Sequence, residues 1–205
     1  WARKYGIHQP ERTRLTLLNN WEATYFDFNQ QVLTSIIHDA ADMGFELFLL
    51  DDGWFGNKHP RNNDDAGLGD WETNHTKLPE GIGQWIIHQP GRELDDTRNR
   101  NQLILDLSNP KVQDFVFGVV DRTMTENPGI AYIKWDCNRF MTNAGSYYLP
   151  KDKQSHIFIE YARGLYKVLD RVREKYPDTY IMLCSGGGGR IDYGTLKYFD
   201  EFWLS

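Results

Sequence analysis

Apolar residues follow two periods along this chain, and each period predicts a different element. A spacing of three and four residues places side chains on one face of a helix. It predicts helices over 29–43, 110–126 and 155–175. Asn29 and the pair Asn109-Pro110 suit the starts of the first two helices, because Asn caps a helix and Pro fits its first position.

Short apolar runs between these helices predict strands. The runs lie at 15–28, where only the first part is apolar, and at 45–55, 101–108, 130–136, 179–190 and 201–205. Nearly continuous apolar runs are typical of parallel strands that are covered on both faces. Because strand and helix alternate repeatedly, we predict an α/β fold with parallel strands.

The stretch 56–100 does not fit this alternation. It contains no convincing strand, and a structureless loop of such length is uncommon in a compact domain. It is therefore either a large active-site loop or the place where a β/α unit is missing. We expect a polar N-terminal segment over 1–14 and one domain over 15–205.

Composition narrows the classes of partner. The net charge of −6 and the lack of a basic cluster argue against nucleic acid. No apolar run is long enough to span a membrane, and no signal sequence begins the chain, so no membrane partner is expected. Cys137 and Cys184 form no disulfide framework, which favours a reducing, cytoplasmic compartment.

Polar or glycine clusters follow four of the predicted strands, where the ligand sites of parallel α/β folds lie. The clusters are 20–22, 51–54, 134–136 and 184–189. For any single cluster, capping of the following helix is an equally good explanation. Their recurrence at four strand ends favours a site that is built from several loops.

Lys134 and Asp136 lie two positions apart on one predicted strand. They therefore share a face with Tyr132, while Ile133 and Trp135 point to the other side. An ammonium group near a carboxylate favours the ionised carboxylate. An ionised, oriented aspartate can act as a nucleophile at the anomeric carbon of a sugar. The alternative is a structural ion pair at the end of a strand.

Asp51 and Asp52 are adjacent and could hold a metal or accept hydrogen bonds from two vicinal hydroxyls. We favour the hydroxyls, because hard cations need several oxygen ligands and the six histidines show no metal-binding spacing. No metal and no other cofactor is predicted.

The glycines 186–189 lack the Gly-Lys-Ser/Thr that defines a phosphate-binding loop. A glycine run after a strand also allows a ligand to approach the backbone closely. Cys184 and Ser185, just before this run, lack the sequence neighbours of a catalytic nucleophile.

Six motifs, in chain order, resemble the catalytic barrel of the glycoside hydrolase family 36 α-galactosidases. They are LLNNWEATYFDF, DDGWFG, LGDW, RNQLILDLSNP, YIKWDCNR and CSGGGGRID. The resemblance implies a (β/α)8 or TIM barrel, of which this chain represents a part. It also implies that the full-length protein forms a homo-oligomer, for example a tetramer. It implies hydrolysis of terminal α-linked galactose from oligosaccharides such as melibiose and raffinose.

The same resemblance implies roles for individual residues. Asp136 is the nucleophile of a retaining double displacement, and Lys134 reaches the sugar hydroxyls beside it. Asp51 and Asp52 bind galactose hydroxyls, including the axial one. The other substrate-binding residues that it implies are Trp21, Arg100, Cys184 and Gly186.

The chain departs from the family pattern in two places. Gly83 runs into Gln84 without the intervening helix and the strand with its Trp-x-Glu-Pro-Glu motif. The acid/base aspartate of the family follows a Trp-x-Ser sequence, and here Ser205 ends the chain. We therefore expect a partial barrel that lacks the third β/α unit, later strands and the acid/base.

Three hypotheses about the function remain open. The first is the α-galactosidase, which the Asp51-Asp52 pair and the Cys-Ser-Gly run favour. The second is a clan relative, either an α-galactosyl transferase or an α-N-acetylgalactosaminidase. The third is a non-catalytic sugar-binding fragment.

Overall fold

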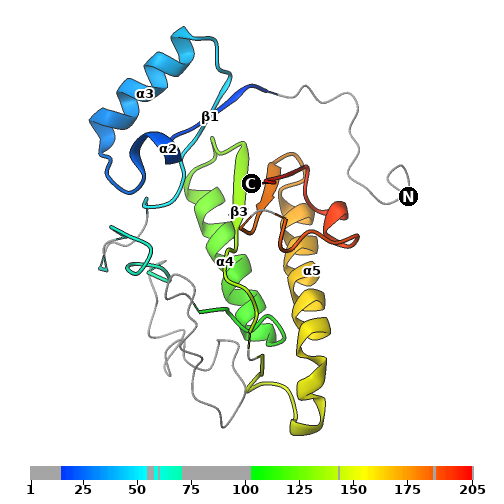
Figure 1. Cartoon of the computed structure of the whole chain (residues 1–205). Coiled ribbons are helices and arrows are strands. Elements are labelled where there is room, and N and C mark those ends of the chain that lie inside the picture. The colour runs from blue at the N-terminus through cyan, green and yellow to red at the C-terminus, as the bar shows by residue number, and fades with distance from the viewer. Residues whose placement is uncertain are drawn as a thin grey trace. The chain divides into compact units, whose positions relative to one another are not determined.

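The structure is a computed structural model that describes residues 15–54, 58–59, 61–70, 103–142, 144–186 and 188–204. The described residues fall into two units, one over 15–70 and one over 103–204. Figure 1 traces the elements of each unit. The N-terminal segment 1–14 and most of the stretch 56–100 lie outside the described residues.

The unit over 15–70 contains two short strands and two helices. The elements are β1 (Leu17–Asn19), α2 (Trp21–Thr24), α3 (Gln30–Asp42) and β2 (Leu47–Leu49). β1 and β2 pair in parallel, with Asn19 opposite Leu49. The long helix between two parallel strands makes this unit a β/α/β arrangement, as the alternation of the sequence predicts.

α3 begins and ends where the sequence predicts. The Asn29 side chain accepts a hydrogen bond from the Val32 N–H at 3.0 Å, which caps the helix. Gly44 follows the last turn with a φ of 84°, a conformation that glycine adopts without strain. The apolar spacing that predicts this helix includes Val32 and Ile37, which are 38% and 42% exposed, so the apolar face is only partly covered.

The unit over 103–204 contains three parallel strands in the order β3-β4-β5. Its elements are α4 (Pro110–Glu126), β3 (Tyr132–Asp136), η3 (Lys151–His156), α5 (Ile157–Lys175), β4 (Tyr180–Cys184), η4 (Thr195–Lys197) and β5 (Glu201–Phe202). The parallel pairing in both units confirms the predicted α/β class.

The strand that the sequence predicts over 101–108 does not form among the described residues. Leu105 makes only an isolated bridge. The buried Asp106 carboxylate then accepts hydrogen bonds from the Ser108 N–H at 3.0 Å and from the Ser108 hydroxyl at 2.5 Å. This local turn directs the chain into α4, because an Asx turn competes with extended backbone.

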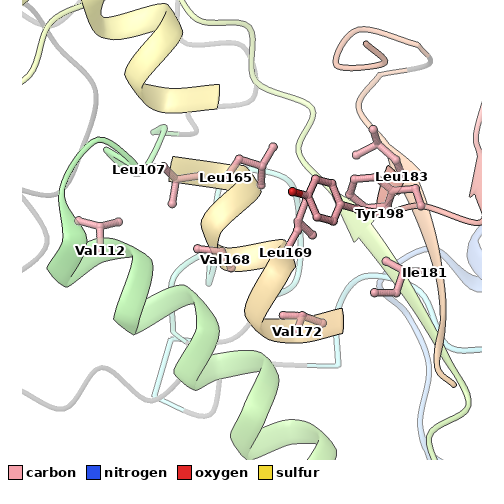
Figure 2. Close-up of a cluster of buried hydrophobic side chains, with 10 residues drawn as sticks. Leu107, Val112, Leu165, Val168, Leu169, Val172, Ile181, Leu183 and Tyr198 are labelled. Carbon is pink, nitrogen blue, oxygen red and sulfur yellow. The ribbon is translucent and has the colours of Figure 1, made fainter. Parts of the chain in front are cut away.

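The core of this unit lies between the β3-β4-β5 sheet and the helices α4 and α5 (Figure 2). β3 contributes Ile133 and Trp135, which pack against the buried cluster. The buried cluster consists of Leu107, Val112, Leu165, Val168, Leu169, Val172, Ile181, Leu183, Tyr198 and Phe199. The opposite face of β3 therefore carries Tyr132, Lys134 and Asp136, as the alternation of the strand predicts.

A partly buried arginine fixes the amino-terminal ends of β4 and β5. The Arg173 guanidinium lies 2.7 Å from an Asp200 carboxylate oxygen and donates to the carbonyl of Thr179 at 2.6 Å. The same Asp200 oxygen accepts the Ile181 N–H at 2.9 Å. This ion pair therefore joins α5 to the starts of both strands.

We expect Gly164→Ala in α5 to destabilise the protein, because an added Cβ would lie 1.8 Å from the carbonyl oxygen of Leu107. Overpacking of this kind costs about 1–3 kcal/mol. The measurement is the urea midpoint of the protein at its natural length. Gly118→Ala in α4 is the matched control, because nothing lies within 4 Å of its added Cβ. Equal shifts for the two variants would contradict the packing of α5 on Leu107.

Candidate active site

The carboxyl-terminal end of β3 brings together residues that the sequence places far apart. β3 and β4 pair so that Asp136 lies opposite Cys184 and Lys134 lies opposite Met182. Asp136 is exposed, whereas Cys184 is buried. The exposed carboxylate therefore stands at the edge where the parallel strands of this unit end, as expected for a ligand site.

Lys134 and Asp136 both act electrostatically on Cys184. Burial raises the pKa of the Cys184 thiol to about 11, and the charge of Asp136 and a hydrogen bond with it add to the rise. The charge of Lys134 acts in the opposite direction on the same pKa. Three of the predicted site residues are thus neighbours, and Cys184 is a neutral thiol near neutral pH.

β5 and the residue that follows it add two side chains to this face, Glu201 and Trp203, which the sequence analysis missed. The Lys134 ammonium lies 5.0 Å from the centroid of the Trp203 ring, a cation–π contact. The Tyr132 hydroxyl donates to a Glu201 carboxylate oxygen at 2.7 Å. Glu201 and Trp203 alternate in the sequence, but only the pairing of β5 with β4 shows that they lie near β3.

The loops that follow β3 and β4 are joined by hydrogen bonds. The Gly186 N–H donates to the Asn138 side-chain oxygen at 2.6 Å. The Arg190 guanidinium donates to the carbonyls of Cys137 and Arg139 at 3.2 and 2.6 Å. The residue after the glycine run therefore holds the segment directly after Asp136, a role that its place in the sequence does not show.

The strand ends of the unit over 15–70 form a second polar cluster. Asp51 is 7% exposed and accepts a hydrogen bond from the Asn19 amide at 2.6 Å. The Asp51 N–H donates to the buried Asn20 side chain at 2.8 Å. These hydrogen bonds connect the end of β1 to the end of β2. Asp51 therefore has a structural role in addition to its predicted role in binding.

Trp21 begins α2, directly after β1. Its N–H donates to the Asn19 side-chain oxygen at 2.7 Å. Its ring contacts Tyr25 and Phe26 edge-on, with ring centroids 5.3 and 5.0 Å apart. Trp21 therefore belongs to an aromatic group beside the polar end of β1.

Asp52 forms an ion pair that the sequence analysis did not predict. The Arg61 guanidinium lies 2.7 Å from one Asp52 oxygen, and the two side chains are 1% and 23% exposed, respectively. No pattern of strand or helix points to Arg61, because it follows β2 in an irregular segment.

The predicted site residues that the structure describes thus fall into two groups, one in each unit. Lys134, Asp136, Cys184 and Gly186 gather in the unit over 103–204, and Trp21, Asp51 and Asp52 gather in the unit over 15–70. Arg100 lies outside the described residues. Within the described residues, no three His, Cys, Asp or Glu side chains are grouped to hold a metal ion. None of the described helices is long and apolar enough to cross a membrane.

Carboxylates and aromatic rings lie at the strand ends of both units. Comparison with known proteins shows the family of the chain. The sequence model of the Melibiase family matches residues 6–84 and 83–205. The α-galactosidase AgaA of Geobacillus stearothermophilus is 38% identical over 228 residues, which cover 95% of this chain. The chain therefore belongs to the Melibiase family, within glycoside hydrolase family 36.

Two solved structures show the same relationship. Variants of the Geobacillus stearothermophilus enzyme AgaA in complex with stachyose and with raffinose each have a TM-score of 0.84. They are 36% and 37% identical to the chain and cover 98% of it. The chain spans 32% of those structures and 30% of the curated relative.

The comparisons also bear on the segment that the sequence analysis expects to be missing. The two matches to the family meet at Gly83 and Gln84, where we place the gap. The alignment with the curated relative, at 228 residues, is longer than the chain of 205 residues. That relative therefore has residues for which this chain has none.

We expect both cysteines to resist alkylation at pH 8. Burial raises the pKa of Cys184 to about 11 and that of Cys137 to about 12, so each thiolate is scarce at that pH. Iodoacetamide should react roughly 100-fold more slowly with either thiol than with an ordinary cysteine. The same protein unfolded in urea is the control and should react at the ordinary rate. Rapid alkylation of the folded protein at pH 8 would contradict this environment.

We expect Arg190→Lys to impair activity in the protein at its natural length, because one ammonium cannot reproduce the fork that holds two carbonyls. A misplaced loop beside Asp136 should lower kcat/KM roughly 10- to 100-fold. Arg173→Lys is the matched control, because Arg173 holds carbonyls at the opposite ends of the strands. It should lower the thermal midpoint and leave kcat/KM at 25 °C unchanged. Equal loss of kcat/KM in both variants would rule out a local effect of Arg190.

Proposed function

We propose that the protein that carries this chain is a retaining α-galactosidase whose (β/α)8 barrel includes this chain. Its substrates are oligosaccharides with a terminal α-linked galactose, such as melibiose and raffinose. The observation that carries the proposal is the position of Asp136 beside Lys134 and Cys184, at the ends of adjacent strands in a Melibiase-family chain. The relatives in complex with stachyose and raffinose support the substrate class.

In the proposed reaction, the Asp136 carboxylate attacks the anomeric carbon of galactose. The bond from that carbon to the leaving oxygen breaks, and a covalent galactosyl-enzyme forms. Water then displaces the aspartate and releases galactose with its original configuration. Asp136 is exposed and is therefore accessible to a sugar. An acid/base group would protonate the leaving oxygen and then take a proton from the attacking water. Among the described residues we assign none to this role.

The remaining residues recognise the sugar. Lys134, whose position the Trp203 ring supports, donates to sugar hydroxyls. Asp51 and Asp52 accept hydrogen bonds from hydroxyls, and Trp21 and Arg100 complete the contacts. Cys184 and Gly186 line the end of β4, where Gly186 is exposed and has no side chain to cover the backbone.

The setting of the reaction is also a proposal. Neither Cys137 nor Cys184 is in a disulfide, which supports a reducing, cytoplasmic compartment. We propose a homo-oligomeric protein, on the basis of the family resemblance alone.

We expect Asp136→Asn to lower kcat/KM for p-nitrophenyl α-galactoside on the order of a thousandfold or more, because loss of the nucleophile removes the covalent route. The protein at its natural length is assayed at one pH, and galactose and transfer products are both quantified. Asp114→Asn is the control, because Asp114 is an exposed residue of α4 that pairs with Arg171.

The outcomes of this assay separate the alternatives. Full activity of Asp136→Asn would show that another residue is the nucleophile. Transfer products in place of free galactose would indicate a transferase. A protein that binds galactosides without turnover would be a sugar-binding module.

A further inference from the structure

The side chain of Arg61 is buried in the unit over 15–70. Its side chain is 1% exposed, and its guanidinium lies over the Phe26 ring at 5.2 Å from the centroid. A buried guanidinium is costly unless its donors are satisfied. The structure satisfies those donors in two different ways, toward a carboxylate and toward the backbone.

The first set of donors is directed at Asp52. Arg61 Nε donates to Asp52 Oδ1 at 3.0 Å, and Nη2 donates to Asp52 Oδ2 at 2.7 Å. Two parallel bonds of this type fix the plane of a carboxylate as well as its position. The Gly53 N–H donates to the same Oδ1 at 2.7 Å, which adds a third constraint.

The second set of donors closes the loop over 61–70. Arg61 Nη1 donates to the carbonyls of Asn63, Asp64 and Ala66 at 2.8, 3.0 and 2.9 Å. The loop packs tightly around this centre. At Gly67, with a φ of 70°, an added Cβ would lie 2.7 Å from the Arg61 Cα.

These contacts leave one atom of Asp52 suited to a ligand. Oδ1 accepts from Arg61 Nε and from Gly53, which uses both of its lone pairs. Oδ2 accepts from Arg61 Nη2, and a second lone pair remains for a further donor. The Asp52 side chain is 23% exposed. A hydroxyl, which donates one hydrogen bond, fits this acceptor.

We propose that Arg61 is a positioning residue that sets the sugar specificity of the site, by holding Asp52 Oδ2 in the one orientation that accepts a particular galactose hydroxyl. This inference rests on the proposed function, in which Asp52 binds galactose. Arg61 itself does not contact the sugar. The competing explanation is that Arg61 only closes the loop over 61–70.

The two explanations differ in what a substitution does to substrate discrimination. If Arg61 acts through Asp52, its loss weakens the recognition of one hydroxyl and leaves a substrate without that hydroxyl unaffected. If Arg61 only supports the loop, its loss lowers activity toward all substrates alike. Lysine keeps the charge but lacks the planar fork, so Arg61→Lys is the informative variant.

The experiment uses the protein at its natural length with p-nitrophenyl α-galactoside and its 2-, 3-, 4- and 6-deoxy analogues. The wild-type protein should discriminate against the analogue that lacks the Asp52-bound hydroxyl by at least roughly tenfold in kcat/KM. Arg61→Lys and Asp52→Asn should each reduce that one ratio roughly tenfold. Their kcat/KM for that analogue should change by less than about threefold, and the double variant should match Asp52→Asn.

Arg173→Lys serves as the control for loss of an arginine fork, because Arg173 also pairs with a carboxylate and with backbone carbonyls. It should leave all four ratios unchanged. Activity of Arg61→Lys on the deoxy substrate shows that this variant folds.

Three outcomes would contradict one of the two claims. Loss of discrimination in Asp52→Asn but not in Arg61→Lys would make Arg61 a purely structural residue and overturn the inference. An equal loss of activity of Arg61→Lys on all five substrates would do the same. Unchanged discrimination in Asp52→Asn would instead remove Asp52 from the proposed sugar contacts, so the two failures are distinct.

Discussion

The packing of Ile133 and Trp135 against the core between the sheet and the helices α4 and α5 determines where Lys134 and Asp136 lie. Successive residues of a strand point to opposite faces, so the apolar pair and the charged pair must be on opposite sides of the sheet. A slip of one residue would bury the charges and expose the apolar side chains. Burial of the core therefore also sets the register that places Asp136 opposite Cys184.

In the loops beyond the strands, hydrogen bonds from arginine side chains to carbonyl groups hold the backbone in place. Loops at strand ends have carbonyls that no neighbouring strand can satisfy, and a guanidinium has five donors in a rigid plane. Arg173 holds the starts of β4 and β5, and Arg190 holds the segment after β3. Arg61 holds the loop over 61–70 together with Asp52. In two of these places the residue that is held is next to, or part of, the candidate site.

The ends of the main helices could be predicted from the sequence because their signals are local. Asn29 and Asn109 cap α3 and α4 as the sequence predicts, and α4 starts at Pro110. The predictions of the strands were less accurate, because the extent of a strand depends on its pairing partners. Within the described residues, the apolar run at 45–55 yields a strand of three residues, and the run at 101–108 yields an Asx turn at Asp106 in place of a strand.

The sequence by itself determined the α/β class, the shared face of Lys134 and Asp136, and the motifs that define the family. These features depend on spacing within a few residues or on short continuous stretches. Only the tertiary structure decided that Trp203 lies against Lys134 and that Arg61 pairs with Asp52. The reason is physical: such contacts join side chains from different elements, so they arise from strand pairing and loop closure, which no local pattern of residues encodes.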